Sequence, residues 1–337
     1  MEKTKNLSFG VQSLLRGAGQ VMFQNSAWCG LLFLAGIFWG ACSAHQCAVA
    51  WGAVVGLAVS TLTGRLLRLP ENDGEQGLWG FNGILVGCAL PTFLGNTAWM
   101  WVALVLCAAL TTWVRTGMNN VMRPWHINSL TFPFVLCTWF FLLAARAMHS
   151  LPPVGMAAPS LPEDFTVFHG ASFGDIVTYW LKGVSQVFLI DSWVTGALFL
   201  AGLAVSNWRA AICAAVGSAV ALAAAILFRG SAADISHGLY GFSPVLTAIA
   251  IATVFYKPGW RSAVWALLGV LVTLFVQAGM NVLLSPVGLA TLTSPFCITT
   301  WLFLLPLIRL DNTAAKPDHT DWDEHRKPHL RRRNGKK

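Results

Sequence analysis

Polar side chains that carry no charge recur at matching places in the two halves of this sequence, inside segments that are otherwise apolar. Gln20 and Gln186 begin the stretches QVMF and QVFL, and Thr131 and Thr293 belong to the stretches LTFPF and LTSPF. Amides and hydroxyls both donate and accept hydrogen bonds, so they can replace the water around a small polar solute without a counter-ion. The paired residues therefore predict a path or binding site for an uncharged molecule.

Prolines strengthen this prediction for the threonines. Pro133 and Pro295 each lie two residues after a threonine. Proline removes one backbone donor and frees carbonyls in the preceding turn, and a free carbonyl within a membrane needs a hydrogen-bond partner. A solute rich in N–H groups is such a partner. Two alternatives stay open: the glutamines can bond between helices, and the threonine hydroxyls can bond back to their own helices.

Apolar residues are paired in the same way, and they could form the walls of a slot. The repeated positions comprise two Phe/Leu pairs four residues apart and the residues three places after the glutamines: Phe81 with Leu85, Phe242 with Leu246, and Phe23 with Leu189. Residues four apart share one face of a helix. Aromatic walls admit a flat molecule and exclude its water, whereas each residue taken singly is as easily explained by core packing.

Charged groups are scarce in the apolar segments. Asp73 and Asp234 each precede the motif Gly-Leu-aromatic-Gly-Phe, where we interpret them as helix caps, and Lys182 with Asp191 are the main ionisable residues near a span. Transporters that couple to ions or protons usually carry carboxylates or histidines within the membrane. The sequence therefore favours passive movement of a neutral solute.

The elements that position these residues form a duplicated unit. Residues 14–40, LLRGAGQVMFQNSAWCGLLFLAGIFWG, align with residues 180–206, WLKGVSQVFLIDSWVTGALFLAGLAVS. The stretches GLWGFNGIL and GLYGFSPVL follow in the same order, and so do LTFPFVLCTWFFLL and LTSPFCITTWLFLL. Duplicated membrane units commonly hold a solute site at their interface.

Composition places this unit in a membrane. The chain is 55% hydrophobic and 11% charged, whereas soluble domains carry about 25% charged residues. Ten apolar stretches are long enough to be predicted spans: 27–43, 44–64, 78–94, 97–114, 129–147, 193–206, 210–228, 238–256, 262–280 and 289–308. The half-polar stretches 8–24 and 174–190 suit re-entrant half-helices buried in protein.

Basic residues orient these spans. With the N-terminus in the cytoplasm, the predicted outer loops near 44–46, 95–97 and 281–288 carry no Lys or Arg, whereas the predicted inner loops carry eight: Arg65, Arg68, Arg115, Arg123, Arg209, Lys257, Arg261 and Arg309. Arg146 and Arg229 are the exceptions to the positive-inside rule. Because each half has five full crossings, the second half starts on the opposite side, which predicts an inverted repeat. We predict an all-α polytopic protein with a first repeat at 1–147, an external linker at 148–173, a second repeat at 174–310 and a basic cytoplasmic tail at 311–337.

The sequence offers little for enzymatic, metal or nucleic-acid chemistry. Most cysteines lie in apolar runs, so no disulfide framework is implied, and the spacing of Cys42, His45 and Cys47 fits no common zinc pattern. A membrane enzyme would need clustered histidines with carboxylates, but the histidines are scattered, at His45, His126, His149, His169 and His237. We therefore predict no enzyme activity, metal or cofactor, and we interpret the basic tail as a solvated topology marker rather than a nucleic-acid site.

Taken together, these motifs resemble the urea transporters, in particular the bacterial members. RGAGQVMF with KGVSQVFL, GLWGFNGIL with GLYGFSPVL, and LTFPF with LTSPF carry the resemblance, which covers about residues 12–308. It implies a homotrimer in which each protomer has its own pore, located in the inner membrane of a bacterium, with urea as the permeant and the lipid bilayer as the surroundings.

The resemblance also assigns roles to the paired residues. It implies a selectivity filter in which Gln20 and Gln186 belong to the half-helices, Thr131 and Thr293 form the central threonine pair, and aromatic slots flank them. The expected slot walls are Phe81, Leu85, Phe242, Leu246, Phe23 and Leu189. Leu189 for Phe23, and Ser243 for Asn82, break the symmetry of the halves. A channel for another small neutral solute, such as a short amide, ammonia or water, is the alternative.

Overall fold

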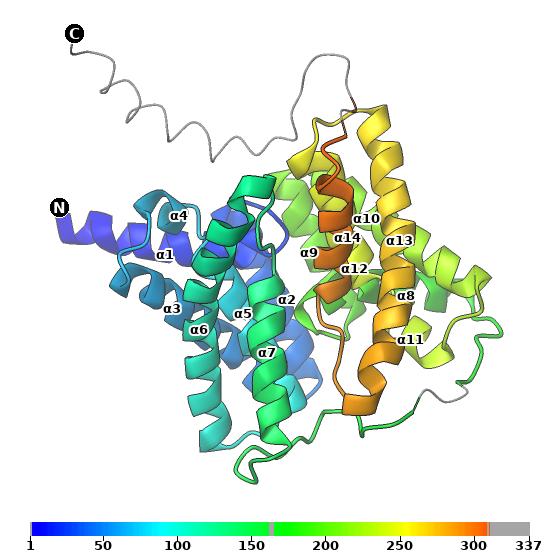
Figure 1. The fold of residues 1–337 in the computed structure, drawn as a ribbon, viewed down its shortest axis with the longest axis horizontal. Helices are drawn as coiled ribbons and strands as arrows, with labels where there is room; N and C mark the ends of the chain where they lie inside the picture. The colour runs from blue at the N-terminus through cyan, green and yellow to red at the C-terminus, as the bar shows by residue number, and fades with distance from the viewer. Residues whose placement is uncertain (1, 162–164, 309, 311–337) are drawn as a thin grey trace.

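The computed structural model describes residues 2–161, 165–308 and 310, and over these residues the chain is helical, with one isolated bridge between Val167 and Ser231. In Figure 1, α6, α7, α13 and α14 run from the top to the bottom of the view. The predicted basic tail, 311–337, and part of the predicted linker, 148–173, lie outside the described residues.

The same order of helices occurs twice. The first half contains α1 (Glu2–Gln20), α2 (Ala27–Ser43), α3 (Cys47–Leu66), α4 (Glu71–Glu75), α5 (Phe81–Phe93), α6 (Ala98–Met122), the short 3-10 helix η1 (Arg123–Trp125) and α7 (Phe132–Ala145). The second half contains α8 (Phe173–Ser185), η2 (Gln186–Phe188), α9 (Trp193–Ser206), α10 (Trp208–Leu227), α11 (Ala232–Ser236), α12 (Phe242–Ile249), the π-helix η3 (Ala250–Phe255), α13 (Trp260–Leu284), η4 (Ser285–Val287) and α14 (Ser294–Leu304). Each half therefore begins with a polar helix and ends with a proline-initiated one.

Four helices are long and apolar enough to cross a membrane by themselves: α3, α6 with η1, α10, and α13 with η4. A fifth crossing results if α8 with η2 and α9 are joined, although they meet at a bend of 72°. This number is smaller than the ten full spans predicted. Helices α2, α5, α7, α14 and the joined α12 and η3 occupy the other predicted positions, but they are only 10–17 residues long.

The two predicted half-helices end where the sequence places their glutamines. Helix α1 stops at Gln20, and α8 stops one residue before Gln186. Phe23 and Leu189 then adopt left-handed backbone conformations, with φ of 61° and 58°, which L-residues with a Cβ rarely adopt. Each turn leads to a serine, Ser26 or Ser192, whose side chain caps the next helix. The turns therefore reverse the chain at matching points.

Left-handed turns recur throughout the two halves in register. The other matching pairs are Arg68 with Arg229, Gly77 with Gly238, His126 with Gly288, and Leu130 with Leu292. A left-handed non-glycine residue costs about 1–2 kcal/mol, so surrounding packing must hold each of these turns. Their recurrence shows that the duplication in the sequence extends to the backbone.

Close helix packing joins the elements. Helices α3 and α5 approach so closely that a Cβ added at Gly56 or Gly83 would collide with the other helix. Between the halves, α2 packs on α9 through the rings of Phe33 and Phe199, whose centroids are 4.9 Å apart. A Cβ at Gly36 would meet Phe199, and one at Gly202 would meet Phe33. This contact is therefore reciprocal.

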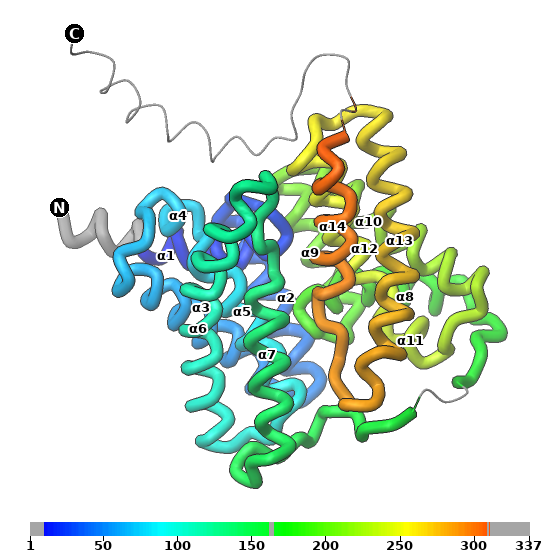
Figure 2. The backbone as a smooth tube through the Cα atoms, viewed as in Figure 1, coloured from blue at the N-terminus to red at the C-terminus, as the bar shows by residue number. Residues whose placement is uncertain are grey.

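The arrangement places α7 and α14 in the middle of the molecule. Figures 1 and 2 show both between α6 on one side and α13 on the other. Both helices begin with a Thr-x-Pro sequence in which proline occupies the first turn, a position where its missing N–H has no intrahelical partner to lose. The interface of the two halves therefore contains two helix starts.

One cysteine pair departs from the sequence prediction. Cys42, at the end of α2, forms a disulfide with Cys47 at the start of α3. The sequence implies no disulfide framework, and the spacing of Cys42 and Cys47 suggested only a metal motif to be excluded, so this single disulfide was not predicted. The turn between α2 and α3 brings the two side chains together. The six cysteines in apolar runs are free, five of them buried.

Candidate functional site

The two halves meet at a contact between paired threonines. The hydroxyl oxygens of Thr131 and Thr293 lie 2.6 Å apart, with both residues at least 97% buried, and the Sγ atom of Cys297 lies 3.4 Å from Thr131 Oγ1. Each threonine is the N-cap residue of its helix, but neither side chain caps that helix. The structure therefore favours a contact between the halves over hydroxyls bonded back to their own helices.

Two features outside the predicted site hold this contact. Leu130 and Leu292, directly before the threonines, have left-handed φ angles of 51° and 49°. The indole N–H groups of Trp139 and Trp301 donate to the carbonyls of Ala290 and Asn128, each over 2.9 Å. Trp139 of α7 thus binds the loop before α14, and Trp301 of α14 binds the loop before α7. The aligned stretches CTWFF and TTWLF place these tryptophans at matching positions, but their bonds between the halves were not predicted from the sequence.

Asn82 supplies the cap that Thr131 does not. Its Oδ1 atom accepts the backbone N–H of Phe134, in the first turn of α7, over 3.2 Å. The first N–H groups of a helix have no intrahelical acceptor and need one from elsewhere. At the corresponding place in the second half, the shorter Ser243 is buried, and no partner of its hydroxyl is seen within the described residues. Asn82 is a positioning residue that the sequence analysis noted only as an asymmetry.

Both predicted glutamines bond to the turns that precede α5 and α12. The Nε2 group of Gln20 donates to the carbonyl of Gln76, and that of Gln186 donates to the carbonyl of His237, each over 2.9 Å. Each glutamine therefore bonds to a neighbouring segment, which is the alternative to a solute contact that stayed open from the sequence. The carbonyl oxygen Oε1 of each amide has no protein partner among the bonds seen in the described residues. Each amide is therefore fixed and still offers an acceptor.

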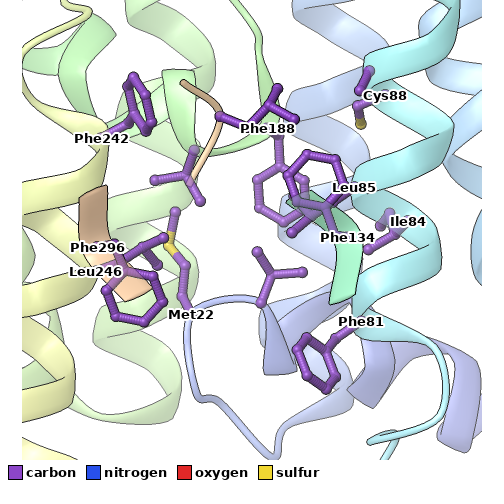
Figure 3. Packing of buried hydrophobic residues seen from close by; sticks show 14 of the residues in the cluster. Met22, Phe81, Ile84, Leu85, Cys88, Phe134, Phe188, Phe242, Leu246 and Phe296 are labelled. Carbon is purple, nitrogen blue, oxygen red and sulfur yellow. The ribbon is translucent and has the colours of Figure 1, made fainter. Parts of the chain in front are cut away.

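The predicted slot walls lie on the two sides of the interface between the halves. In Figure 3, Phe81 and Phe242 are at opposite ends of the view, with Leu85 and Leu246 further along their helices toward its middle. Phe81 and Phe242 are 8% exposed, and the two leucines are fully buried. Helices α5 and α12 therefore present the same two residue types in opposite order along this interface.

The third predicted wall differs between the halves. The ring of Phe23 makes edge contacts with Phe255 and Phe296, with centroids 6.2 and 6.0 Å away. Its mate Leu189 brings no ring, and it packs half-buried against the core. The predicted asymmetry between Phe23 and Leu189 thus has a structural counterpart in this aromatic cluster.

A cavity of about 670 Å³ opens on one side of the threonine contact. It contains four predicted site residues, Gln20, Phe23, Phe81 and Thr131. The rest of its lining includes six residues with amide side chains, Asn25, Asn72, Gln76, Asn119, Asn120 and Asn128. It also includes three charged residues, Asp73, Arg115 and Arg123. The other predicted residues, Leu85, Gln186, Leu189, Phe242, Leu246 and Thr293, lie outside it. The cavity therefore connects the first-half residues to the central contact.

The predicted capping role of the two aspartates was wrong. Asp73 accepts hydrogen bonds from Nη1 and Nη2 of Arg115, over 3.1 and 3.2 Å, and the helix after it is preceded by Gly80 with no side-chain cap. Asp234 lies in α11, where burial raises the pKa of its carboxyl, because the charged form loses hydration there. The aspartates are thus in equivalent places but have different partners.

The ionisable residues Lys182 and Asp191 of the second half pair with each other. Asp191 lies 2.8 Å from Lys182 Nζ and 2.6 Å from His237 Nδ1. Over the described part of the chain, no group of three His, Cys, Asp or Glu side chains is arranged to hold a metal ion. The histidines named in the enzyme alternative do not converge with carboxylates into such a site.

Comparison with known proteins identifies the matching family. The family model described as "Urea transporter" matches residues 11–308. "Urea transporter 1" of Ovis aries is 29% identical over 323 residues, which cover 94% of this chain and 82% of that protein. "Urea transporter 1" of Rattus norvegicus is 29% identical over 312 residues, covering 90% of this chain and 79% of that protein.

Replacement of Asn82 by Ala should destabilise the protein, because it leaves the Phe134 N–H without its acceptor. We expect a loss of about 1 kcal/mol in the free energy of unfolding, typical of a lost N-cap. Chemical unfolding in detergent micelles, followed by tryptophan fluorescence, measures it. Ser243→Ala is the matched control and should change stability by less than about 0.5 kcal/mol. Equal losses in the two variants would contradict the capping role.

Proposed function

Because the chain belongs to the urea transporter family, we propose that it is a passive urea channel whose path runs between the two halves of one chain. The family comprises membrane transporters rather than enzymes, and the several apolar helices agree with a membrane protein. The observation that carries the channel proposal is the Thr131–Thr293 contact of 2.6 Å between the halves, because Thr131 also lines the cavity of about 670 Å³.

Urea suits the chemistry of this path. It is neutral and planar, with four N–H bonds and one carbonyl oxygen, so its loss of water is costly unless acceptors replace that water. The glutamine Oε1 atoms and threonine hydroxyls are neutral acceptors, and Phe81 and Phe242 would face the plane of the molecule. A solute that reaches the threonines would exchange their mutual hydrogen bond for bonds to itself. Several weak sites of this kind permit passage without trapping.

The distribution of charge favours passive movement. The threonine contact has hydroxyls and one thiol around it. The charged pairs of the described site lie towards its two ends, with Asp73 and Arg115 at one and Lys182, Asp191 and His237 at the other. Coupling to a proton or ion would require a group that binds that ion. The two threonine hydroxyls carry no charge, and in the cavity beside them Arg115 is paired with Asp73. These groups therefore suit a channel for a neutral solute.

We also propose that the halves are inverted repeats, at 1–147 and 174–310, joined by an external linker. Five helices in each half would cross the membrane, with α1 and α8 as half-helices. The reciprocal Trp139 and Trp301 bonds and the opposite placement of Phe81 and Phe242 support this proposal. Because the path lies within one chain, it agrees with the homotrimer of separate pores that the family resemblance implies.

Two observations support an orientation of the proposed repeats in the membrane. Basic residues concentrate in the loops that would be cytoplasmic. The Cys42–Cys47 disulfide lies at the α2–α3 turn, which would be external, and disulfides persist in oxidising compartments. We therefore propose that both termini are cytoplasmic, in the plasma membrane, which would be the inner membrane of a bacterium.

Reporter fusions expressed in a Gram-negative host test this orientation. A green fluorescent protein fused after residue 337 should fluoresce, because it folds in the cytoplasm. Alkaline phosphatase inserted after residue 159, in the linker, should be active, because it needs the oxidising periplasm. Active phosphatase at the C-terminus would contradict the orientation.

Urea flux into proteoliposomes, followed by stopped-flow light scattering, tests the transport activity. The protein should speed urea equilibration well above empty liposomes, and a proton gradient should not drive internal urea above the external concentration. Flux equal to empty liposomes would end the urea proposal. If acetamide, ammonia or water passed but urea did not, the alternative solute class would replace it. Accumulation above equilibrium would contradict the channel mechanism.

Replacement of both central threonines tests the path. Thr131→Val with Thr293→Val keeps the side-chain shape but removes both hydroxyls, so we expect urea flux to fall about tenfold, the loss of roughly 1.4 kcal/mol of hydrogen bonding to the passing solute. Thr253→Val, which removes a half-buried hydroxyl bonded to its own helix, is the control and should leave flux near the wild type. Normal flux in a folded double variant would exclude the threonines from the path.

A further inference from the structure

We infer that Arg115 is a specificity-determining residue that keeps flat cations out of the slot formed by Phe81. This inference rests on the proposed function, because it assumes that the solute passes the face of Phe81. It concerns the difference between urea and molecules such as guanidinium, which have the shape of urea but carry a positive charge.

The geometry around Arg115 is that of a fixed cation behind an aromatic wall. The guanidinium carbon lies over the Phe81 ring, 5.7 Å from its centroid. Arg115 is only 7% exposed, and two of its nitrogens donate to one carboxylate oxygen of Asp73. All three residues line the cavity that leads to Thr131. The ion pair fixes the position of the guanidinium, and burial keeps salt from screening it.

An aromatic slot that admits urea needs a feature that excludes flat cations. The face of a phenyl ring attracts cations, by up to about 2 kcal/mol where water is excluded, so a slot that binds the plane of urea would also bind a flat cation. A guanidinium already placed on one face of Phe81 uses the same ring electrons and repels a second cation on the other face. Urea has no net charge, so the same arrangement does not repel it.

The second half lacks this arrangement. Gln277 of α13 occupies the place in the repeat that Arg115 occupies in α6, and it is 1% exposed. Its Nε2 group donates to the carbonyl of Leu239. The three guanidinium–ring contacts within the described residues involve Phe81, Trp208 and Trp260, and none involves Phe242. A charge beside the slot wall is therefore a property of one end of the path.

Inhibition of urea flux by guanidinium tests the inference. Guanidinium chloride is placed at equal concentration on both sides of the proteoliposomes, and potassium chloride at the same ionic strength is the reference. In Arg115→Gln, which copies the residue of the second half, the concentration of guanidinium that halves urea flux should fall about tenfold. Wild-type urea flux in the same preparation tests the proposed function separately, because its absence would remove the channel and not only the role of Arg115.

Three further variants separate the charge of Arg115 from its structural contact. Asp73→Asn keeps the arginine and an amide oxygen that can accept its two hydrogen bonds, so it should resist guanidinium like the wild type. The double variant Asp73→Asn, Arg115→Gln lacks both charges and should still be more sensitive than the wild type, because the ring face is open. Arg209→Gln removes an exposed guanidinium stacked on Trp208 and should change nothing. Each of these results supports the inference.

Three results would overturn it. The first is an Arg115→Gln protein that conducts urea and resists guanidinium like the wild type. The second is equal sensitivity of Asp73→Asn and Arg115→Gln, because loss of the ion pair would then explain the effect. The third is wild-type resistance in the double variant, because the freed carboxylate of Asp73 would then have attracted the cation.

Discussion

Two helices of this protein begin at one buried point, where the hydroxyls of Thr131 and Thr293 meet at 2.6 Å. The N-terminal turns of helices carry unpaired N–H groups and a partial positive charge, so two such ends at one place must be held and satisfied. Reciprocal tryptophan bonds fix the preceding loops, left-handed leucines turn the chain into the helices, and Asn82 caps one of them. Because Asn82 supplies the cap, the Thr131 hydroxyl is available to its partner Thr293.

The two halves share a backbone but differ in chemistry along the interface. The matching left-handed turns and the reciprocal Phe33–Phe199 packing show how closely the backbone repeats. At the first-half end, a cavity rich in amides contains Phe23 and the Arg115–Asp73 pair. At the other end, Leu189 replaces Phe23, and the cluster of Lys182, Asp191 and His237 provides the charge. If the proposed path follows this interface, its two ends therefore differ in chemistry although the backbone repeats.

The sequence predicted this fold well where apolar length and duplication determine it. Helix positions and the half-helix ends at Gln20 and Gln186 follow from repeated stretches with clear hydropathy. The pairing of Thr131 with Thr293 follows because residues matched by a two-fold relation can meet at its axis. Length and composition alone support fewer crossings than predicted, because five of the apolar helices are short.

Contacts between different kinds of residue were harder to predict. The Asp73–Arg115 pair, the Asn82 cap and the Cys42–Cys47 disulfide each depend on how one turn directs a side chain towards a neighbouring element. No repeat marks these partners, since Gln277 and Ser243 replace Arg115 and Asn82 in the other half. The tryptophan bonds were repeated in the sequence, but an indole in an apolar helix is equally typical of core packing.

A reversible covalent bond at the central contact tests most directly whether the solute passes between the threonines. Thr131→Cys with Thr293→Cys, in a Cys297→Val background, places two thiols where the hydroxyls meet, and mass spectrometry shows whether they form a disulfide. If the path runs through this contact, urea flux into proteoliposomes stops in the oxidised protein and returns after reduction. Unchanged flux in a protein with the disulfide fully formed would contradict the account.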